Sequence, residues 1–315
     1  MQTNTPKLWQ PLRPGAIVDI IAPASACPQK EQLSTLAAIR ATLTAWQLVP
    51  RIPENIYGED LLCANSTAQR FIQLKNALLN TDATAIWCLR GGYGSAHLLP
   101  QLASLPAPAH NKLFMGMSDI TALHLFLQQQ WGWATLHSPS ARQVSLGDVH
   151  ADNIAEVKHI LLGQLTNCQY NLTPLNSLAA GNSTINAMIT GGNLSIVQTS
   201  LGTFWQINAA NKILFLEEIN ERGYRVDRIL EHLSQAGIFN KVTAVIFGDF
   251  TKGQEPDGSS LLIPVLERFA AQANFPVLRC LGIGHDNYNR PLPLGVPAQL
   301  HLGTPSNLHI ELGRS

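Results

Sequence analysis

The sequence predicts an α/β protein with two domains. Apolar, strand-like runs alternate with amphipathic, helix-like stretches through the first half of the chain, an order typical of a parallel sheet with helices on both faces. Hydrophobic residues make up 45% of the 315 residues, which is enough to bury a large core. At roughly 150 residues per domain, a chain of this length forms two domains or one large one.

The first half supplies the elements of the parallel sheet. In such a sheet, ligand sites lie beyond the carboxyl ends of the strands, so the turns that follow strands are the first places to search for function. The expected strands are 16–22, 83–89, 113–116 and 134–137, and the expected helices are 29–46, 67–79, 95–102 and 120–130.

A polar segment separates the two predicted domains. A helix at 151–162 leads into a stretch rich in Asn, Thr, Ser, Gly and Pro, a composition typical of a connection. We therefore expect an N-terminal domain at 1–163, a connection at 164–186 and a C-terminal domain at 187–315. The second half has strand-like runs at 212–216, 242–248, 298–302 and 308–312, and helical stretches at 225–236 and 260–271.

The charge composition excludes several classes of protein. Lys and Arg number 21, as do Asp and Glu, and charged residues form 13% of the chain against about 25% in an average globular protein. A nucleic-acid binder would show a basic excess, and a membrane-surface protein would show basic amphipathic helices. We expect neither nucleic acid nor membrane as a partner.

The N-terminus and the cysteines indicate a cytoplasmic protein. The first 15 residues lack the basic start and apolar centre of a secretory signal, and the best early apolar run is interrupted by Asp19. Five cysteines are odd in number, scattered and never in CxxC spacing, as expected for reduced thiols without a disulfide framework or a zinc site. No cofactor and no metal are expected.

Two turns after predicted strands have the residues of a catalytic or anion-binding site. Arg90-Gly91-Gly92-Tyr93-Gly94-Ser95 follows one strand, and its glycines allow backbone N–H groups to face a ligand, although it could equally be a plain tight turn. Gly116-Met117-Ser118-Asp119 runs from a strand directly into a helix, the local geometry of a nucleophile elbow. The alternative is that Ser118 or Asp119 only caps the helix.

Two later turns carry a carboxylate and an imidazole. The apolar run 213–216 ends in Glu217 and Glu218, where an α/β fold places the residue that orients a catalytic histidine. These carboxylates could instead pair with nearby arginines, because eight charged residues lie between Glu217 and Glu231. His285 follows the strand-like run 277–281 and is preceded by Gly284, although a lone loop histidine is more often only solvated.

The order Ser118, Glu217, His285 is that of the triads of α/β-hydrolases, without their complete GxSxG signature. A competing interpretation is a non-catalytic small-molecule binder on a Rossmann-like scaffold, in which the two glycine turns bind an anion. That protein would need neither the carboxylate nor the histidine, and a fold alone does not imply a function.

Seven segments resemble the LD-carboxypeptidases, or muramoyltetrapeptide carboxypeptidases, and the related microcin C self-immunity proteins. The resemblance implies a Rossmann- or flavodoxin-like N-terminal domain and a smaller C-terminal α/β domain resembling a swivelling β/α barrel. It implies a serine peptidase with the triad Ser118, Glu217 and His285, an oxyanion hole from the N–H groups of Gly92 and Asp119, and a homodimer. The segments are LRPGAIVDIIAPAS, CLRGGYGSAHLL, FMGMSDITALH, GGNLSIVQTSLGT, FLEEINERGYRVDRIL, AVIFGDF and GIGHDNYNRPLPLGVPAQL.

The chain departs from the family pattern at three places. Met117 stands where relatives commonly have an aromatic, Glu218 where they commonly have Asp, and Ser138 where they usually have Gly. Met117 bears on the shape of the pocket. The Glu217-Glu218 doublet leaves open which carboxylate orients the imidazole, and alignment on the residues FLE favours Glu217.

The implied reaction is hydrolysis of the L,D peptide bond that releases terminal D-Ala from a murein tetrapeptide during cell-wall recycling. Microcin-type relatives instead cleave an aminoacyl-sulfamoyl adenylate and use an aromatic of the connection, typically Trp, to stack on the base. The connection here has no Trp and a single aromatic, Tyr170, which favours the murein substrate. Arg90, Arg222 and Arg225 are the candidate substrate-binding cations.

Overall fold

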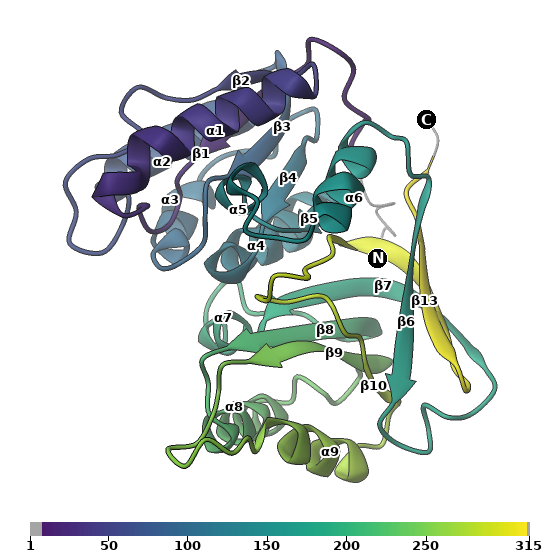
Figure 1. Cartoon of the computed structure of the whole chain (residues 1–315). Helices are drawn as coiled ribbons and strands as arrows, with labels where there is room; N and C mark the ends of the chain where they lie inside the picture. Colours follow the sequence, from purple (N-terminus) through teal and green to yellow (C-terminus); the bar gives the residue numbers. More distant parts are fainter. Residues whose placement is uncertain (1–7, 314–315) are drawn as a thin grey trace. The chain divides into compact units, whose positions relative to one another are not determined.

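A computed structural model describes residues 8–313 of the chain, which divide into two units (Figure 1). The first unit contains residues 8–166 together with Arg290–Leu292. The second contains Asn167–Asn289 and Pro293–Gly313. The chain therefore leaves the second unit, returns briefly to the first and then completes the second. The predicted α/β class is confirmed.

The first unit is built on a six-stranded sheet with the order β11-β5-β4-β3-β1-β2. Strands β1 to β5 pair in parallel, so their carboxyl ends lie at one edge of the sheet, as the alternating sequence predicts. The strands are β1 (Ile17–Ile21), β2 (Val49–Arg51), β3 (Ala83–Cys88), β4 (Leu113–Gly116), β5 (Thr135–His137) and β11 (Leu292–Leu294).

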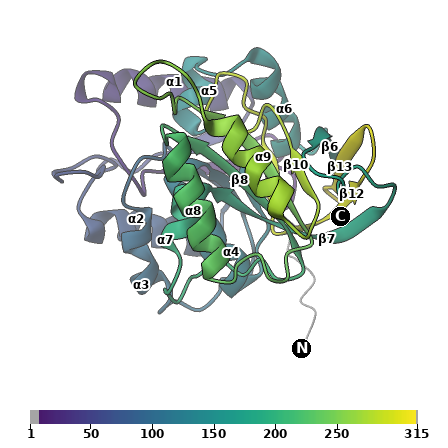
Figure 2. The same ribbon diagram turned by 90° about the horizontal axis from the view of Figure 1, so that it is seen from below.

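Helices cover both faces of this sheet. Helices α1 and α5 lie together on one face, and α2 and α3 lie on the other (Figures 1 and 2). The predicted helix 95–102 is a 3-10 turn, Ser95–Leu98, followed by the short α3. The helices are α1 (Gln32–Ala45), α2 (Thr67–Leu79), α3 (Leu99–Leu102), α4 (Thr121–Trp131), α5 (Ala141–Leu146) and α6 (Ala151–Leu161).

The second unit is a closed barrel with the order β10-β6-β13-β12-β7-β8-β9. Strands β7, β8, β9 and β10 pair in parallel, and the remaining pairs are antiparallel. The strands are β6 (Asn167–Pro174), β7 (Thr184–Asn193), β8 (Lys212–Ile219), β9 (Ala244–Thr251), β10 (Val277–Arg279), β12 (Val296–His301) and β13 (Ser306–Glu311).

Three helices belong to the barrel unit. Helix α7 (Leu194–Thr199) follows β7 directly, and α8 (Gly223–Gln235) and α9 (Leu262–Gln272) lie side by side (Figure 2). None of the helices within residues 8–313 is both long enough and apolar enough to cross a bilayer.

The segment 164–186, expected to be a connection, instead contains β6 and the beginning of β7. Despite its polar composition, the segment forms a strand in which Cys168, Tyr170 and Leu172 are buried while their neighbours face outward. This alternation is the period of a strand with one face on the core, and the polar residues between them fill the other face. The segment therefore belongs to the barrel.

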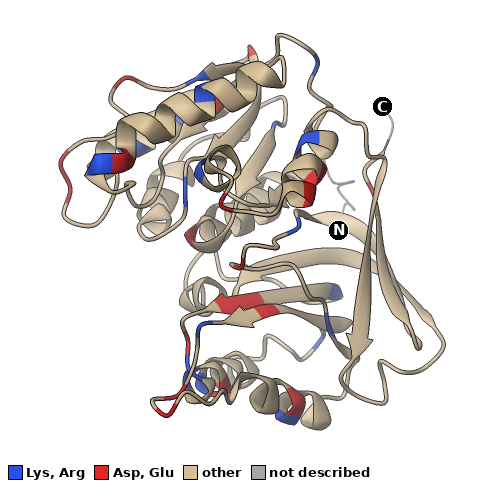
Figure 3. Ribbon diagram, in the orientation of Figure 1, with Lys and Arg blue, Asp and Glu red and all other residues tan. Residues whose placement is uncertain are grey.

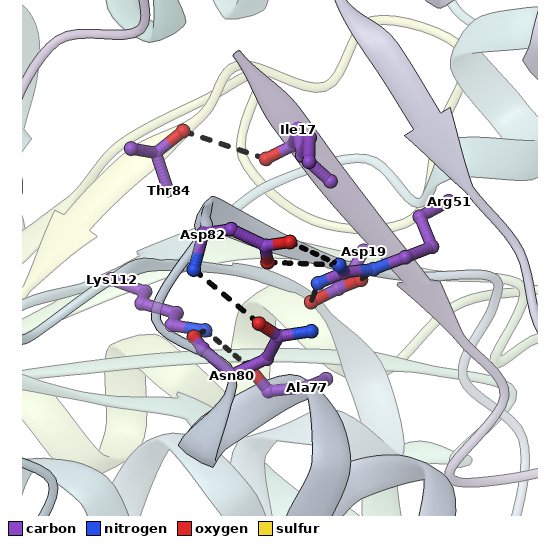
Figure 4. Close-up of polar contacts among 8 residues, drawn as sticks. All are labelled: Ile17, Asp19, Arg51, Ala77, Asn80, Asp82, Thr84 and Lys112. Atoms are coloured by element: carbon purple, nitrogen blue, oxygen red, sulfur yellow. Dashed lines mark hydrogen bonds and ion pairs between the residues drawn. The ribbon is translucent and has the colours of Figure 1, made fainter.

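Buried and partly exposed charges form polar contacts around β1, β2 and the end of α2 (Figure 4). Asp19 on β1 is 5% exposed and accepts two hydrogen bonds from Arg51 on β2, at 2.5 and 2.9 Å. Arg51 also binds the exposed Asp82, at 2.8 and 3.0 Å. Lys112 is buried nearby and donates to the carbonyls of Ala77, at 2.6 Å, and Asn80, where α2 ends. An ammonium is favourable at the C-terminal end of a helix.

Asp19→Ala is expected to lower the free energy of unfolding by about 1 to 3 kcal/mol, because it removes the buried partner of a guanidinium that is a third exposed. Urea unfolding followed by circular dichroism measures the change. Asp82→Ala is the matched control, with an expected loss below about 1 kcal/mol since that pair faces solvent. Equal losses in the two variants would contradict this assignment.

Candidate active site

Ser118 lies at a strained turn between β4 and α4. Met117 is extended, with φ −149° and ψ −179°, and Ser118 then takes φ +64°, a conformation that costs a non-glycine residue of order 1 kcal/mol. A short 3-10 helix, Ser118–Ile120, continues directly into α4. The backbone is thus that of a nucleophile elbow, which directs a serine hydroxyl out of the sheet at the start of a helix.

His124 on α4 fixes the backbone just before this turn. It is fully buried, and its Nε2 lies 2.8 Å from the carbonyl oxygen of Gly116. Burial lowers the pKa of His124 to about 3, so the ring is neutral at working pH. Because a carbonyl only accepts, Nε2 must carry the proton. The N–H of Ser138 binds the same carbonyl at 3.0 Å, so two donors hold the end of β4.

The glycine turn after β3 lies against Ser118. A Cβ atom at Gly91 would be 2.8 Å from the Cβ of Ser118, so only glycine allows this approach. Gly92 has φ +114°, and a Cβ there would be 2.5 Å from Oγ of Ser25. The structure therefore brings together, within the first unit, the two turns that the sequence analysis selected separately.

Two hydrogen bonds, both donated by Ser95, join these turns. The N–H of Ser95 donates to Oδ2 of Asp119 at 2.8 Å, and Oγ of Ser95 donates to the carbonyl of Asp119 at 2.6 Å. Asp119 and Ser95 are both buried. This pairing uses the Asp119 side chain for support and aligns the start of the helix after Ser118 with the start of the helix after Gly94.

A buried arginine, which sequence reasoning missed, supports the same edge of the sheet. Arg70 on α2 is 1% exposed and donates to the carbonyls of Asn65 (2.9 Å), Pro23 (2.5 Å) and Gly94 (2.8 Å). The signal was present in the helical spacing, because Arg70 shares the buried face of α2 with Leu74 and Ala77. One side chain thus links the loops that follow β1, β2 and β3.

Arg90 precedes the glycine turn and keeps most of its donors available. It is half-buried, and Nη1 donates to the carbonyl of Ala26 at 2.9 Å. Among residues 8–313, no carboxylate lies within ion-pair distance of its guanidinium. Arg142, by contrast, pairs with Glu31 and Asp148 at 3.1 and 2.6 Å.

Glu217 and His285 meet in the second unit. Nδ1 of His285 lies 2.6 Å from Oε2 of Glu217, and the Glu217 side chain is fully buried. A carboxylate only accepts, so Nδ1 carries the proton and Nε2 is the basic nitrogen of the neutral ring. Burial lowers the pKa of His285, but the charge of Glu217 and its hydrogen bond outweigh burial, so the pKa is raised.

The two adjacent carboxylates have different partners. They are consecutive residues of β8, in which side chains alternate between the two faces, and the register between β8 and β9 also shifts between Leu216 and Glu218. Glu218 points to the start of α7, where it accepts from Nδ2 of Asn193 (3.0 Å) and from the N–H (2.8 Å) and Oγ (2.6 Å) of Ser195. Burial, followed by the charge of Glu217, raises the pKa of Glu218. Glu218 is thus occupied in supporting a helix.

The two other candidate cations of the sequence analysis have carboxylate partners. Arg222 binds Glu255, with Nε 2.8 Å from Oε2, and Arg225 pairs with Glu221 one helical turn away. The guanidinium of Arg222 also lies 5.1 Å from the centre of the Tyr224 ring. These arginines are thus occupied by ion pairs at the beginning of α8, and within residues 8–313 Arg90 is the candidate without such a partner.

The fold and these side chains are typical of a hydrolase of the peptidase class. The chain belongs to the LD-carboxypeptidase family. The model of the family's N-terminal domain matches residues 18–138, and that of its C-terminal domain matches residues 186–300.

Relatives from three bacteria agree with this assignment. The chain is 40% identical over 278 residues to a Rickettsia conorii protein that is named as a carboxypeptidase. The match covers 87% of this chain and 84% of the relative. It is 30% identical to the "Probable murein peptide carboxypeptidase" of Bacillus subtilis, covering 96% and 94%. It is 29% identical to the murein tetrapeptide carboxypeptidase of Pseudomonas aeruginosa, covering 94% and 96%.

Solved structures share the fold over nearly the whole chain. The muramoyltetrapeptide carboxypeptidase from Oxalobacter formigenes superposes with a TM-score of 0.78 at 25% identity, covering 94% of this chain and 99% of that one. The microcin C7 self immunity protein MccF, in complex with aspartyl sulfamoyl adenosine, gives a TM-score of 0.78 at 20% identity, covering 97% and 98%.

Glu217→Gln is expected to lower the pKa of His285, because it removes the charge that opposes the effect of burial. An NMR titration of the His285 ring nitrogens measures the shift. With its raised pKa, protonated His285 stabilises the fold below about pH 6.5, and this contribution is lost as the pH rises through the folded-state pKa. Glu217→Gln should therefore reduce the stability at low pH.

The matched control for this titration is Glu218→Gln, which should lower the pKa of His285 less, since Glu218 contributes only at longer range. An unchanged His285 pKa in Glu217→Gln would show that the carboxylate does not act on the ring.

Proposed function

We propose that this carboxypeptidase hydrolyses the L,D peptide bond that releases terminal D-Ala from muramoyl tetrapeptides, with Ser118 as nucleophile, His285 as base and Glu217 as the residue that orients His285. The 2.6 Å contact between His285 Nδ1 and Glu217 Oε2 is the observation that carries the proposal. The names of the Bacillus and Pseudomonas relatives support the murein substrate.

In this mechanism Oγ of Ser118 attacks the carbonyl carbon of the scissile bond, and Nε2 of His285 accepts its proton. The N–H groups of Gly92 and Asp119 stabilise the oxyanion, each donor contributing about 3 kcal/mol. His285 then gives the proton to the departing amine of D-Ala, and water hydrolyses the acyl-enzyme. Since His285 must be neutral to act as base, its raised pKa makes activity increase with pH through that pKa.

Arg90 is proposed to bind the carboxylate of the terminal D-residue. Arg90 directly precedes Gly91, where a Cβ atom would be 2.8 Å from the Cβ of Ser118, and this proximity along the chain supports the proposal. A guanidinium presents paired donors that match a carboxylate, and the lack of a carboxylate partner among the described residues leaves these donors available. A carboxypeptidase requires such a group because it selects chain ends.

The segment 164–186, first expected to be a connection, argues against the microcin-type alternative. Its one aromatic, Tyr170, is 1% exposed inside the barrel, so it offers no surface for stacking on a base. Trp133 and Trp205 are also buried. Incubation with aspartyl sulfamoyl adenosine, followed by mass spectrometry of released aspartate, tests this alternative directly.

We further propose that the enzyme acts in the cytoplasm as a homodimer. All five cysteines are buried and free, as expected in a reducing compartment. The dimer follows from the family resemblance.

Ser118→Ala and His285→Ala should each reduce the release of D-Ala from muramoyl tetrapeptide by about 10³-fold or more, because each removes a group that makes or breaks a bond. Mass spectrometry of the released amino acid, at equal concentrations of folded protein, measures the rate. A fluorophosphonate probe should label the wild type and leave Ser118→Ala unlabelled. Release by Ser118→Ala at the wild-type rate would refute the nucleophile assignment.

Arg90→Met should lower kcat/KM for the tetrapeptide acid by about 10- to 100-fold, the cost of losing hydrogen bonds to a charged group. For the same peptide with a C-terminal amide, the variant and the wild type should differ little, because the charge that Arg90 recognises is already absent. The control is Arg142→Met, whose guanidinium is neutralised by Glu31 and Asp148. Unchanged acid-over-amide preference in Arg90→Met would rule out this role.

A further inference from the structure

Asp249 is a buried carboxylate that the proposed mechanism does not use. It lies near the carboxyl end of β9, next to the strand that carries Glu217, and is 8% exposed. Figure 3 shows acidic residues on both β8 and β9. The pKa of Asp249 is raised to about 6, mainly by burial; the charges of Asp286 and Glu217 also raise it, whereas the Gly282 N–H and Arg279 lower it. The ionised form of Asp249 is therefore destabilised by its surroundings.

The side chain of Asp249 holds the loop that leads to His285. The N–H of Gly282 donates to Oδ2 at 3.0 Å and is 3.3 Å from Oδ1. The N–H of Asp249 itself donates to the carbonyl of Ile283 at 2.8 Å. Gly282 and Ile283, which lie three and two positions before His285, are thus both hydrogen-bonded to Asp249.

The loop also packs directly on Asp249. A Cβ atom at Gly284 would be 2.8 Å from the Cβ of Asp249, so the backbone passes this side chain at a distance that only glycine permits. On the other side, the N–H of Gly284 donates to Oδ1 of the buried Asn289 at 3.2 Å. The path of the chain into His285 is fixed from both sides.

This support complements the contact with Glu217. The hydrogen bond to Glu217 sets the orientation of the His285 ring, but it does not determine where the backbone of His285 lies. That position comes from the run 282–284, which the carboxylate of Asp249 on β9 holds through the N–H of Gly282. A displacement of about 1 Å in a catalytic group can cost 10²-fold in rate.

We infer that Asp249 is a positioning residue for the reaction: through its hydrogen bond to Gly282 it sets the backbone position from which His285 reaches Glu217 and acts as base. The inference rests on the proposed role of His285. The hydrogen bond, and not the negative charge, carries the effect, because an uncharged acceptor at the same place would hold Gly282 as well.

The test compares Asp249→Ala with Asp249→Asn in the full chain, assayed by D-Ala release from muramoyl tetrapeptide. Asp249→Ala keeps the main-chain bond to Ile283 and loses only the side-chain acceptor. Its kcat should fall about 10- to 100-fold while KM stays within about twofold, since the substrate contacts are elsewhere. Asp249→Asn retains an acceptor oxygen and should keep kcat within about threefold.

The pH profile separates position from general destabilisation. The groups that act on His285 are Glu217, Glu218 and Asp286, all of which raise its pKa against burial. If Asp249→Ala loosens the contact with Glu217, the acidic limb of kcat/KM moves to lower pH in this variant and stays near the wild-type position in Asp249→Asn. Equal shifts in both variants would assign the effect to charge and overturn the inference.

A control variant tests whether loss of any carboxylate in the second unit has the same effect. Asp227→Ala removes a carboxylate of the same unit that pairs with Arg268, and it should leave kcat and the pH profile unchanged. An equal loss in Asp227→Ala, or wild-type kcat in Asp249→Ala, overturns the inference.

If Asp249→Ala does not fold, Gly284→Ala replaces it, because its methyl group displaces the loop with Asp249 intact. It should show the same loss of kcat and the same pH shift, and wild-type behaviour would overturn the inference.

His285→Ala distinguishes this failure from that of the proposed function. If His285→Ala releases D-Ala at the wild-type rate, the base assignment is wrong whatever Asp249 does. If His285→Ala is inactive and Asp249→Ala is fully active, the base assignment stands and only the role of Asp249 is overturned.

Discussion

The hydrogen bond between Glu217 and His285 is the constraint around which the second unit is organised. A fully buried carboxylate is costly unless donors satisfy it, and the imidazole supplies one at 2.6 Å. Several features serve this pair. Alternation along β8 sends Glu217 and Glu218 to different partners, and the interactions of Glu218 with the start of α7 hold the strand end in place. Asp249 then holds the loop from which the imidazole comes.

The first unit meets a different requirement, because its candidate groups are mostly main-chain atoms. Backbone N–H groups have no rotamers to select, so their directions depend on how the turns are held. Buried polar side chains do this: Arg70 binds the carbonyls of three loops, Asp119 and Ser95 bind each other, and His124 holds the carbonyl of Gly116. The strained φ of Ser118 persists because its neighbours are fixed in this way.

The sequence predicts β1, β3, β4 and β5, since each is a short apolar run followed by a helix. It does not predict β2, a short strand with a central proline, or β11, which comes from a distant part of the chain. It selects Ser118, Glu217 and His285 because polar residues there follow apolar runs, although Glu217 lies within β8 and His285 lies in the loop after β10. The order of residues alone does not decide between Glu217 and Glu218, since the partner of each depends on how β8 pairs and packs; the alignment on FLE favours Glu217. Asp249 escapes notice for a similar reason: its partner, Gly282, is 33 residues away.

The return of the chain to the first sheet at β11 limits how the protein can be divided. Residues Arg290–Leu292 belong to the first unit, and Arg290 binds Glu156 at 2.6 Å, yet the chain before and after them forms the barrel. A fragment ending at residue 166 would lack the strand beside β5 and would expose an unpaired sheet edge, which favours aggregation. The two units are therefore not two consecutive modules, and exchanging one of them between relatives requires transplanting two separate pieces of sequence together.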